Sequence, residues 1–180
     1  MKFKPTLIGG ALVVEMERLE DDRGYFARTW CTEEFAAHGL KASMAQCSIS
    51  FNRVRGTLRG MHYQVSPSLE AKLIRCSRGA IYDVIVDARR GSATEGKFFG
   101  LQLTQDDPVM LYAPEGVAHG FITLTDDAEV IYTMSTAYQP DDQAGFRWDD
   151  PEVAIEWPIP PSRISSRDAN LPLFAARRVP

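Results

Sequence analysis

The chain has 180 residues, 44% of them hydrophobic and 24% charged, and its formal net charge is −4 at pH 7. These values fit one globular domain over residues 1–180 with a core of its own. An acidic chain has no general attraction for nucleic acid, and no stretch approaches about 18 apolar residues, so we expect neither nucleic-acid binding nor a membrane span. The cysteines, Cys31, Cys47 and Cys76, form no C-x-x-C motif, which favours reduced thiols and a cytoplasmic protein.

The first clear element is a short helix near residues 32–38. Thr32 is a candidate N-cap, Glu33 and Glu34 suit the positive end of a helix, and Gly39 can close it. This is the one convincing helix signal, so we expect the rest of the chain to determine the fold class.

The middle of the chain reads as short strands separated by turn residues. The strands are predicted at 42–51, 56–64, 72–78, 80–87, 97–104, 109–113, 119–124 and 129–138. The run 80–87 is too apolar for a solvent-facing edge, and its Asp83 and Asp87 should share one face and need partners or water. The regular spacing predicts an all-β fold, an antiparallel sandwich or barrel.

After Tyr138 the pattern changes to a segment rich in Pro, Asp and Trp, over residues 139–161. We expect an irregular C-terminal arm that packs on the sheet through Trp148 and Trp157. A last short helix is predicted over residues 167–174.

The most informative motif lies in the strand predicted at 56–64, where Arg59 precedes His62 by three residues. Strand alternation places such residues on opposite faces, but Gly60 between them can mark a bulge that re-aims one side chain. A permanent cation beside a group that titrates near neutrality suits an anionic substrate undergoing proton transfer. Taken alone, the pair also fits a solvated arginine and a hydrogen-bonded core histidine.

A second motif, P-x-G-x-x-H from Pro114 to His119, has the form of the second half-motif of the cupin barrel. A small barrel of this kind can hold one ligand. Cupin metal sites take two histidines and an acid from the first half-motif, where this chain offers His62 alone and the placement of Glu70 is uncertain. We therefore expect no metal, and a metal-dependent cupin enzyme is the alternative.

The remaining chemistry is acid–base catalysis on carbon. His62 can take a proton from a carbon beside a carbonyl, and Lys72 can stabilise the oxygen of the resulting enolate. Tyr132 and Tyr138, six apart on one predicted strand, can share a face and supply the returning proton. Asp168 is the candidate carboxylate that orients the histidine, although sequence spacing alone does not select it.

The residues of these motifs resemble a known family. The segments that carry the resemblance are 22–26, 56–64, 72–74, 79–87, 114–121, 148–151 and 165–168, together with Tyr132 and Tyr138. In this order, from about residue 20 to 170, they are similar to the dTDP-4-dehydrorhamnose 3,5-epimerase family.

The resemblance implies a cupin-like jelly roll without metal or other cofactor, usually a homodimer with strands exchanged between subunits. It implies inversion at C5, C3 or both of a 4-keto-6-deoxyhexose on a nucleoside diphosphate, for deoxysugar and surface polysaccharide synthesis. His62 would be the base with Asp168 as its partner, Tyr132 the acid, and Lys72 would sit near the carbonyl oxygen. Substrate-binding roles would fall to Arg23, Phe26, Arg28, Gln46, Ser48, Arg59, His119, Tyr138, Gln143 and Arg167.

The sequence departs from the family pattern mainly at the nucleotide end. Arg28 stands where the family has a glutamate that contacts the base, Ser48 replaces an asparagine, Gln143 a glutamate and Arg167 a lysine. An arginine in place of a carboxylate reverses charge and hydrogen-bond sense, so the nucleotide can be dTDP or CDP. A binding module that kept the pocket and lost catalysis is a third interpretation.

Overall fold

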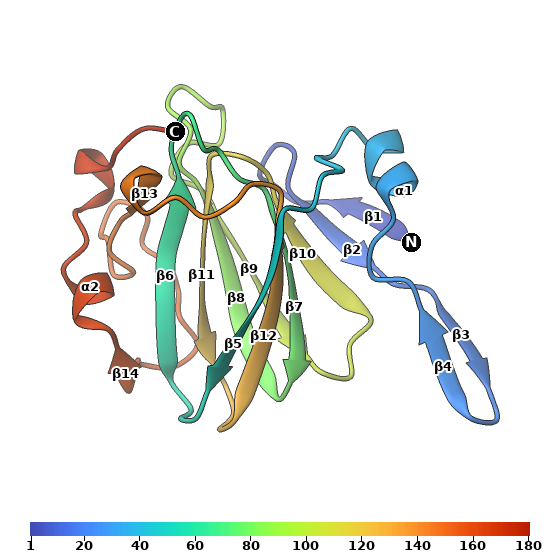
Figure 1. Cartoon of the computed structure of the whole chain (residues 1–180). Coiled ribbons are helices and arrows are strands. Elements are labelled where there is room, and N and C mark those ends of the chain that lie inside the picture. Colours follow the sequence, from blue (N-terminus) through green and yellow to red (C-terminus); the bar gives the residue numbers. More distant parts are fainter.

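The computed structural model describes all 180 residues as two antiparallel β-sheets packed face to face, with one hairpin projecting from their side (Figure 1). The first sheet has the order β1-β2-β10-β7-β12-β5, and the second has the order β13-β6-β11-β8-β9, with β14 parallel to β6. The hairpin is β3-β4. The strands are β1 (Lys2–Pro5), β2 (Leu12–Glu15), β3 (Arg18–Asp21), β4 (Gly24–Ala27), β5 (Gln46–Asn52), β6 (Thr57–Gln64), β7 (Lys72–Arg78), β8 (Ala80–Asp87), β9 (Phe98–Thr104), β10 (Val109–Ala113), β11 (Val117–Thr123), β12 (Ala128–Met134), β13 (Gln143–Gly145) and β14 (Arg163–Ile164).

The main core lies between the two sheets. Both sheets contribute fully buried side chains to it, including Ile74 and Leu111 from the first sheet and Ile81, Ile85 and Phe121 from the second. Because alternate residues of a strand face one side, this inward row of each strand is apolar except where it reaches the polar end of the sandwich.

The outer faces of both sheets are also covered. Helix α1 (Thr32–Ala37) places Phe35 on the outer face of the first sheet, where it meets Met110 and Tyr112. The C-terminal arm covers the second sheet with Phe146 and Phe174. A strand buried on both faces needs apolar residues in both rows, which explains the nearly continuous apolar run of β8.

All eight strands predicted between residues 42 and 138 are present, and the all-β jelly-roll class is confirmed. The expectation of a barrel needs one correction, because no ladder joins the sheet edges into a closed cylinder. Strand β12 ends at Met134, so Tyr138 is not on the strand of Tyr132. Strands β1 to β4, β13 and β14 were not predicted, since each has only two to four residues and shows no alternation of its own.

The helix near residues 32–38 is confirmed, but Cys31 rather than Thr32 is its N-cap and no side chain caps it. Gly39 follows the helix with φ +70°, as a closing glycine does. The helix predicted over residues 167–174 is wrong. The chain forms one turn, α2 (Ser166–Ala169), and separate 3₁₀ turns at Phe174–Ala176 and, earlier, Pro140–Asp142.

The arm packs as expected through Trp157, whose ring meets Tyr82 edge-on, while Trp148 contributes its carbonyl oxygen to the indole N–H of Trp157 at 2.9 Å. Helix α2 stops because Pro172 follows it and cannot continue a helical hydrogen-bond ladder. None of the helices has the length and apolar character that a bilayer crossing requires.

Asp87 at the end of β8 organises the loop that follows it. Its fully buried carboxylate accepts two hydrogen bonds from the guanidinium of Arg89, at 2.8 Å each, and one from the amide of Arg89, at 3.1 Å. The hydroxyls of Ser92 and Thr94 donate one more each, at 2.6 Å. Burial opposes ionisation, but these bonds outweigh it and lower the pKa of Asp87 from 3.8 to about 2. The predicted need of this aspartate for partners is thus met inside its own loop.

Asp87→Asn is expected to lower the free energy of unfolding at pH 7 by about 2 kcal/mol. Because the folded-state pKa is depressed, this contribution is complete above about pH 4 and is lost as the pH falls through about 2. Urea unfolding at several pH values should therefore show that the free energy of unfolding of the variant falls less steeply with decreasing pH, below about pH 4, than that of the wild type. Asp149→Asn, which removes a more exposed partner of Arg147, is the control, and equal limbs for Asp87→Asn and the wild type would contradict the assignment.

Candidate active site

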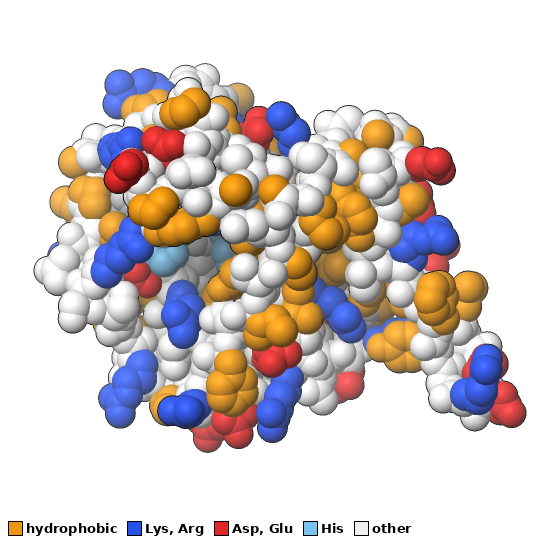
Figure 2. Space-filling model, viewed as in Figure 1, with side chains coloured by type: hydrophobic (Ala, Val, Ile, Leu, Met, Phe, Trp, Pro, Cys, Tyr) orange, Lys and Arg blue, Asp and Glu red, His pale blue; other side chains and the backbone are white.

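A cavity of about 590 Å³ opens between the two sheets. Figure 2 shows it as a hollow with histidine atoms visible inside. Eleven of the fourteen predicted site residues line it: Gln46, Ser48, Arg59, His62, Lys72, His119, Tyr132, Tyr138, Gln143, Arg167 and Asp168. The structure therefore brings together residues that are spread over more than 120 positions of the chain.

A bulge in β6 places Arg59 and His62 in the same cavity. His119 on β11 lies opposite His62, and two residues later Phe121 lies opposite Arg59, so β6 uses three steps where β11 uses two. The extra residue falls at Gly60, whose φ is +137°. The predicted bulge is confirmed, and it cancels the alternation that would separate the two side chains.

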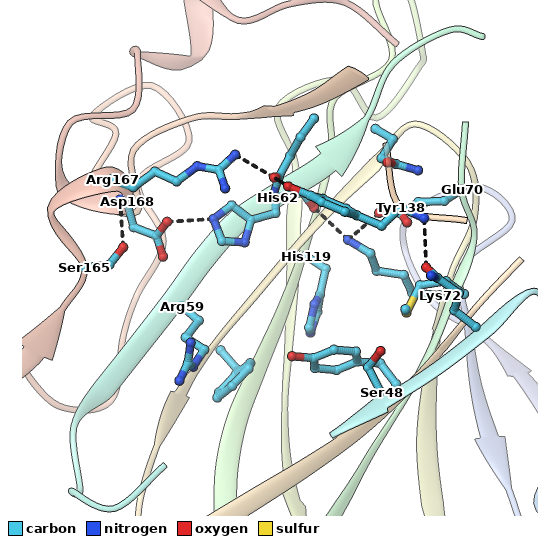
Figure 3. A pocket seen from close by; sticks show the side chains of 16 residues that line it. Ser48, Arg59, His62, Glu70, Lys72, His119, Tyr138, Ser165, Arg167 and Asp168 are labelled. Atoms are coloured by element: carbon cyan, nitrogen blue, oxygen red, sulfur yellow. Dashed lines mark hydrogen bonds and ion pairs between the residues drawn. The ribbon is translucent and has the colours of Figure 1, made fainter. Parts of the chain in front are cut away.

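His62 is held by Asp168. The Nε2 of His62 lies 2.8 Å from Oδ1 of Asp168, and the amide of Gly60 donates to Oδ2 at 3.2 Å. Asp168 is 4% exposed, and its own amide donates to the hydroxyl of Ser165, the N-cap of α2. Figure 3 shows the pair at the side of the cavity. The C-terminal arm therefore supplies the orienting carboxylate.

The ionisation of Asp168 fixes the tautomer of His62. Burial opposes the charge, but the hydrogen bond and charge of His62 and the bond from Gly60 outweigh it and lower the pKa of Asp168. An ionised carboxylate accepts only, so Nε2 of His62 carries the hydrogen. The lone pair of the neutral ring is then on Nδ1, which is free to accept a proton.

Lys72 lies next to His62 at the start of β7. Its Nζ donates to the backbone oxygen of His62 at 3.2 Å and pairs with Oε1 of Glu70 at 2.8 Å. The ammonium is thus held within hydrogen-bonding distance of the backbone of His62.

Tyr132 and His119 line the cavity from different sheets, and His119 is the cross-strand neighbour of His62. Tyr132 stands on β12 of the first sheet, and its ring meets the ring of His119 edge-on at 6.3 Å between centroids. His119 Nε2 lies 2.7 Å from Oδ1 of Asp83, which is fully buried. Burial raises the pKa of Asp83 against the opposing effect of His119. Asp83, unlike Asp87, therefore finds its partner in the site.

The mouth of the cavity is bordered by a hydrogen-bonded chain. The hydroxyl of Tyr138 and the guanidinium of Arg167 both donate to Oε1 of Gln143, the second at 2.6 Å. The amide of Tyr138 donates to Oε1 of Gln46 at 2.8 Å. Both glutamine oxygens are engaged, so their NH₂ groups are the parts left for a ligand.

Arg59 lines the cavity, and its Nε is bound to Oδ1 of Asn52 at 2.7 Å. A fixed guanidinium with free terminal N–H groups can bind a phosphate in two-pronged geometry. Ser48 on β5 is the cross-strand neighbour of Tyr132 and belongs to the same wall of the cavity.

Three predicted residues do not reach this cavity. Arg23 and Phe26 belong to the β3-β4 hairpin, which projects away from the sheets (Figure 1). Arg23 pairs with Asp21, Phe26 is 66% exposed, and Arg28 pairs with Glu34 of α1 at 3.4 Å. Within a single chain, these residues are therefore separate from the site.

Sequence reasoning missed five residues that line the cavity: Gln64, Glu70, Phe121, Met134 and Ser165. Glu70 lies in the irregular segment before β7, so strand alternation from Lys72 does not extend to it. The signal for Ser165 was its place three residues before Asp168, the spacing of an N-cap. No group of three or more His, Cys, Asp or Glu side chains is placed to hold a metal ion.

The comparison with known proteins agrees with this site. A family model described as dTDP-4-dehydrorhamnose 3,5-epimerase matches residues 5–176. The chain belongs to this family. It is 39% identical over 158 residues to the dTDP-4-dehydrorhamnose 3,5-epimerase of Methanothermobacter thermautotrophicus, over 88% of this chain and 84% of that protein.

Solved structures of the dTDP-4-dehydrorhamnose 3,5-epimerase family share the fold. The enzyme from Elizabethkingia anophelis matches with a TM-score of 0.94 at 33% identity, over 97% of both chains. The dTDP-6-deoxy-D-glucose-3,5-epimerase from Legionella pneumophila, in complex with dTDP-4-keto-L-rhamnose, matches with a TM-score of 0.91 at 30% identity, over 97% of this chain and 93% of that one. The predicted family and the predicted class of enzyme, an epimerase, are confirmed.

Gly60→Ala is expected to destabilise the protein by about 2 kcal/mol or more and to abolish activity. An added Cβ would lie 2.5 Å from Cα of Gly120, so the bulge would have to shift and separate Arg59 from His62. Gly91→Ala is the matched control, because Gly91 also has positive φ, +76°, but nothing lies near its Cβ position. Equal unfolding free energies for the two variants would contradict this account.

Proposed function

We propose that this protein inverts C5, C3 or both of a nucleoside-diphosphate-linked 4-keto-6-deoxyhexose by proton transfer through an enolate. One observation carries the proposal. His62 with Asp168 and Tyr132 enter one cavity from opposite sheets, with the ammonium of Lys72 beside the histidine. A base and an acid on facing walls can act on the two faces of a sugar ring held between them.

The reaction begins at Nδ1 of His62, which removes the proton from the carbon beside the ketone. The electron pair of the C–H bond moves into the new C–C double bond, and the ketone oxygen becomes the enolate oxygen. The Lys72 ammonium stabilises that charge. The hydroxyl of Tyr132 then gives its proton to the opposite face of the carbon, which inverts it. Solvent returns the surplus proton of His62 to the tyrosinate.

The diphosphate is assigned to Arg59, and His119 to the sugar. Tyr138, Gln46, Ser48, Gln143 and Arg167 at the mouth are assigned to the nucleoside. The free NH₂ groups of the two glutamines suit acceptor oxygens of a base or ribose. No cofactor enters this proposal.

We propose that the working form is a homodimer. Arg23, Phe26 and Arg28 are exposed on or beside a hairpin that has no contact with the cavity of its own chain. Exchange of this hairpin would bring them to the cavity of a second copy, with Arg23 toward the diphosphate and Phe26 toward the nucleoside. An exposed aromatic on a projecting strand pair supports such pairing.

We place the protein in the cytoplasm, in a route that makes deoxysugars for surface polysaccharide. The three cysteines are all free, which supports a reducing compartment.

His62→Asn is expected to lower kcat by at least about 100-fold, because the base that removes the proton is lost. Proton NMR in D₂O with dTDP- and CDP-4-keto-6-deoxyglucose should show solvent deuterium entering C5, C3 or both with the wild type and at neither with the variant. Binding of the nucleotide should persist. His38→Asn, which changes a histidine that stacks on Phe3 far from the cavity, is the control.

Tyr132→Phe separates the two halves of the reaction. It should lose inversion and keep exchange at the carbon that His62 deprotonates. Wild-type exchange in His62→Asn would remove the proposed base, and a complete lack of exchange in the wild type would favour a binding module. A stoichiometric transition metal with activity lost on chelation would favour the metal-dependent alternative.

Nucleotide selectivity is expected to be weak. Thymine presents an N3–H donor, which a carboxylate accepts and the guanidinium of Arg28 does not, whereas N3 of cytosine is an acceptor. Isothermal titration should therefore give dissociation constants for dTDP and CDP within about tenfold of each other. Arg28→Glu should restore a preference for dTDP. A wild-type preference for dTDP clearly above tenfold would contradict this part of the proposal.

A further inference from the structure

The cavity contains a buried ion pair whose carboxylate, that of Glu70, has no part in the reaction described above. Glu70 and Lys72 lie two residues apart, both line the cavity, and their side chains are 7% and 11% exposed. Removing two charges from water costs free energy that their mutual attraction offsets only in good geometry, so such a pair is weak support for stability. A buried pair inside a ligand cavity instead points to a role in what the cavity does.

The pair fixes the direction of the Lys72 ammonium. Two acceptors are bound to Nζ, namely Oε1 of Glu70 at 2.8 Å and the backbone oxygen of His62 at 3.2 Å. Figure 3 shows Nζ between them. An ammonium has three N–H groups in tetrahedral arrangement, so two fixed acceptors leave one N–H, with its direction set, for a ligand.

Glu70 itself stands on a rigid support. The hydroxyl of Ser135 accepts from the amide of Ala71 at 2.8 Å, and the amide of Ser135 donates to the oxygen of Ala71 at 3.0 Å. The hydroxyl of Thr136 donates to the oxygen of Leu69 at 2.8 Å. The backbone on both sides of Glu70 is thus tied to the segment that follows β12, the strand of Tyr132.

The other charged and titratable groups around Lys72 are already engaged. Asp83 on β8 is within electrostatic reach of Lys72 but is bonded to His119. His62 on β6 is bonded to Asp168. Glu70 is the one carboxylate hydrogen-bonded to the ammonium.

We propose that Glu70 is a positioning residue for the epimerisation. Its carboxylate holds the buried Lys72 ammonium in place and aims the remaining N–H at the ketone oxygen, where charge develops as the enolate forms. The inference rests on the proposed function, since it acts through Lys72. It adds a residue for which the resemblance implies no role.

Glu70→Ala is the first test. kcat and solvent deuterium incorporation should fall by about 10- to 100-fold, while KM changes less than about threefold. The reason is that the aimed N–H stabilises the negative charge of the enolate-like transition state, which the bound ketone does not yet carry. C3 and C5 share one ketone, so every position that exchanges in the wild type should slow by the same factor. The control is Glu15→Gln, which neutralises the exposed partner of Lys4 and should change neither value.

Glu70→Gln is the second test, and it keeps an acceptor for Nζ without the charge. It should recover most of the activity that Glu70→Ala loses at pH 7. Its rate should then decline at a lower pH than the wild-type rate on the alkaline side, because a buried ammonium without its counter-charge releases its proton more readily.

The outcomes separate this inference from the proposed function. A folded Glu70→Ala protein with wild-type exchange overturns the inference, as does a Glu70→Gln protein whose alkaline limb superimposes on that of the wild type. Where Glu70→Ala does not fold, the alkaline limb of Glu70→Gln decides alone. Exchange that persists in His62→Asn overturns the proposed function, whatever the Glu70 variants show.

Discussion

The site depends on the close approach of two backbones at Gly60 and Gly120. Neither position has room for a Cβ, since one at Gly60 would meet the Cα of Gly120 and one at Gly120 would meet the sulfur of Met61. This approach lets β6 carry an extra residue against β11, and the extra residue turns Arg59 to the side of His62. The same bulge points the amide of Gly60 at Asp168. One local constraint thus positions the arginine that can bind an anion, the histidine base and the carboxylate partner of that base.

Three pairs of ionisable groups stand at the cavity of this apolar sandwich. His62 with Asp168, His119 with Asp83 and Lys72 with Glu70 each join a side chain in the cavity to a carboxylate that is almost or fully buried. Burying any member alone would cost several kcal/mol or change its charge state. The carboxylates come from the arm, from β8 and from the segment before β7, so the cavity is assembled only when these distant segments dock.

Sequence reasoning reached the parts of this site that local physics determines. The glycine between Arg59 and His62 predicted a bulge, and the apolar run of β8 indicated a strand that is buried on both faces. It failed where tertiary contacts decide. The N-terminal strands have no alternation of their own. The helix predicted over residues 167–174 failed for a local reason instead, because Pro172 lies within that range and α2 ends at Ala169. Asp168 was reached only through the family resemblance, because nothing in its spacing relates it to His62, 106 residues away.

The residues assigned to proton transfer stand on strands, whereas most of those assigned to nucleotide binding stand on irregular segments. His62, Lys72 and Tyr132 stand within strands whose ladders run through the middle of the sheets, so their positions follow from the fold. Tyr138 lies in the irregular segment after β12, Arg167 in a one-turn helix, and Arg28 beyond the projecting hairpin. A substitution in such segments changes what the mouth binds and leaves the strand ladders intact. Three of the four departures from the family pattern, at residues 28, 143 and 167, lie at the mouth or on the hairpin side. The fourth, Ser48, is the cross-strand neighbour of Tyr132, and none of the four is a member of the acid–base set. A change of nucleotide with the same proton chemistry is therefore the kind of divergence that this architecture permits.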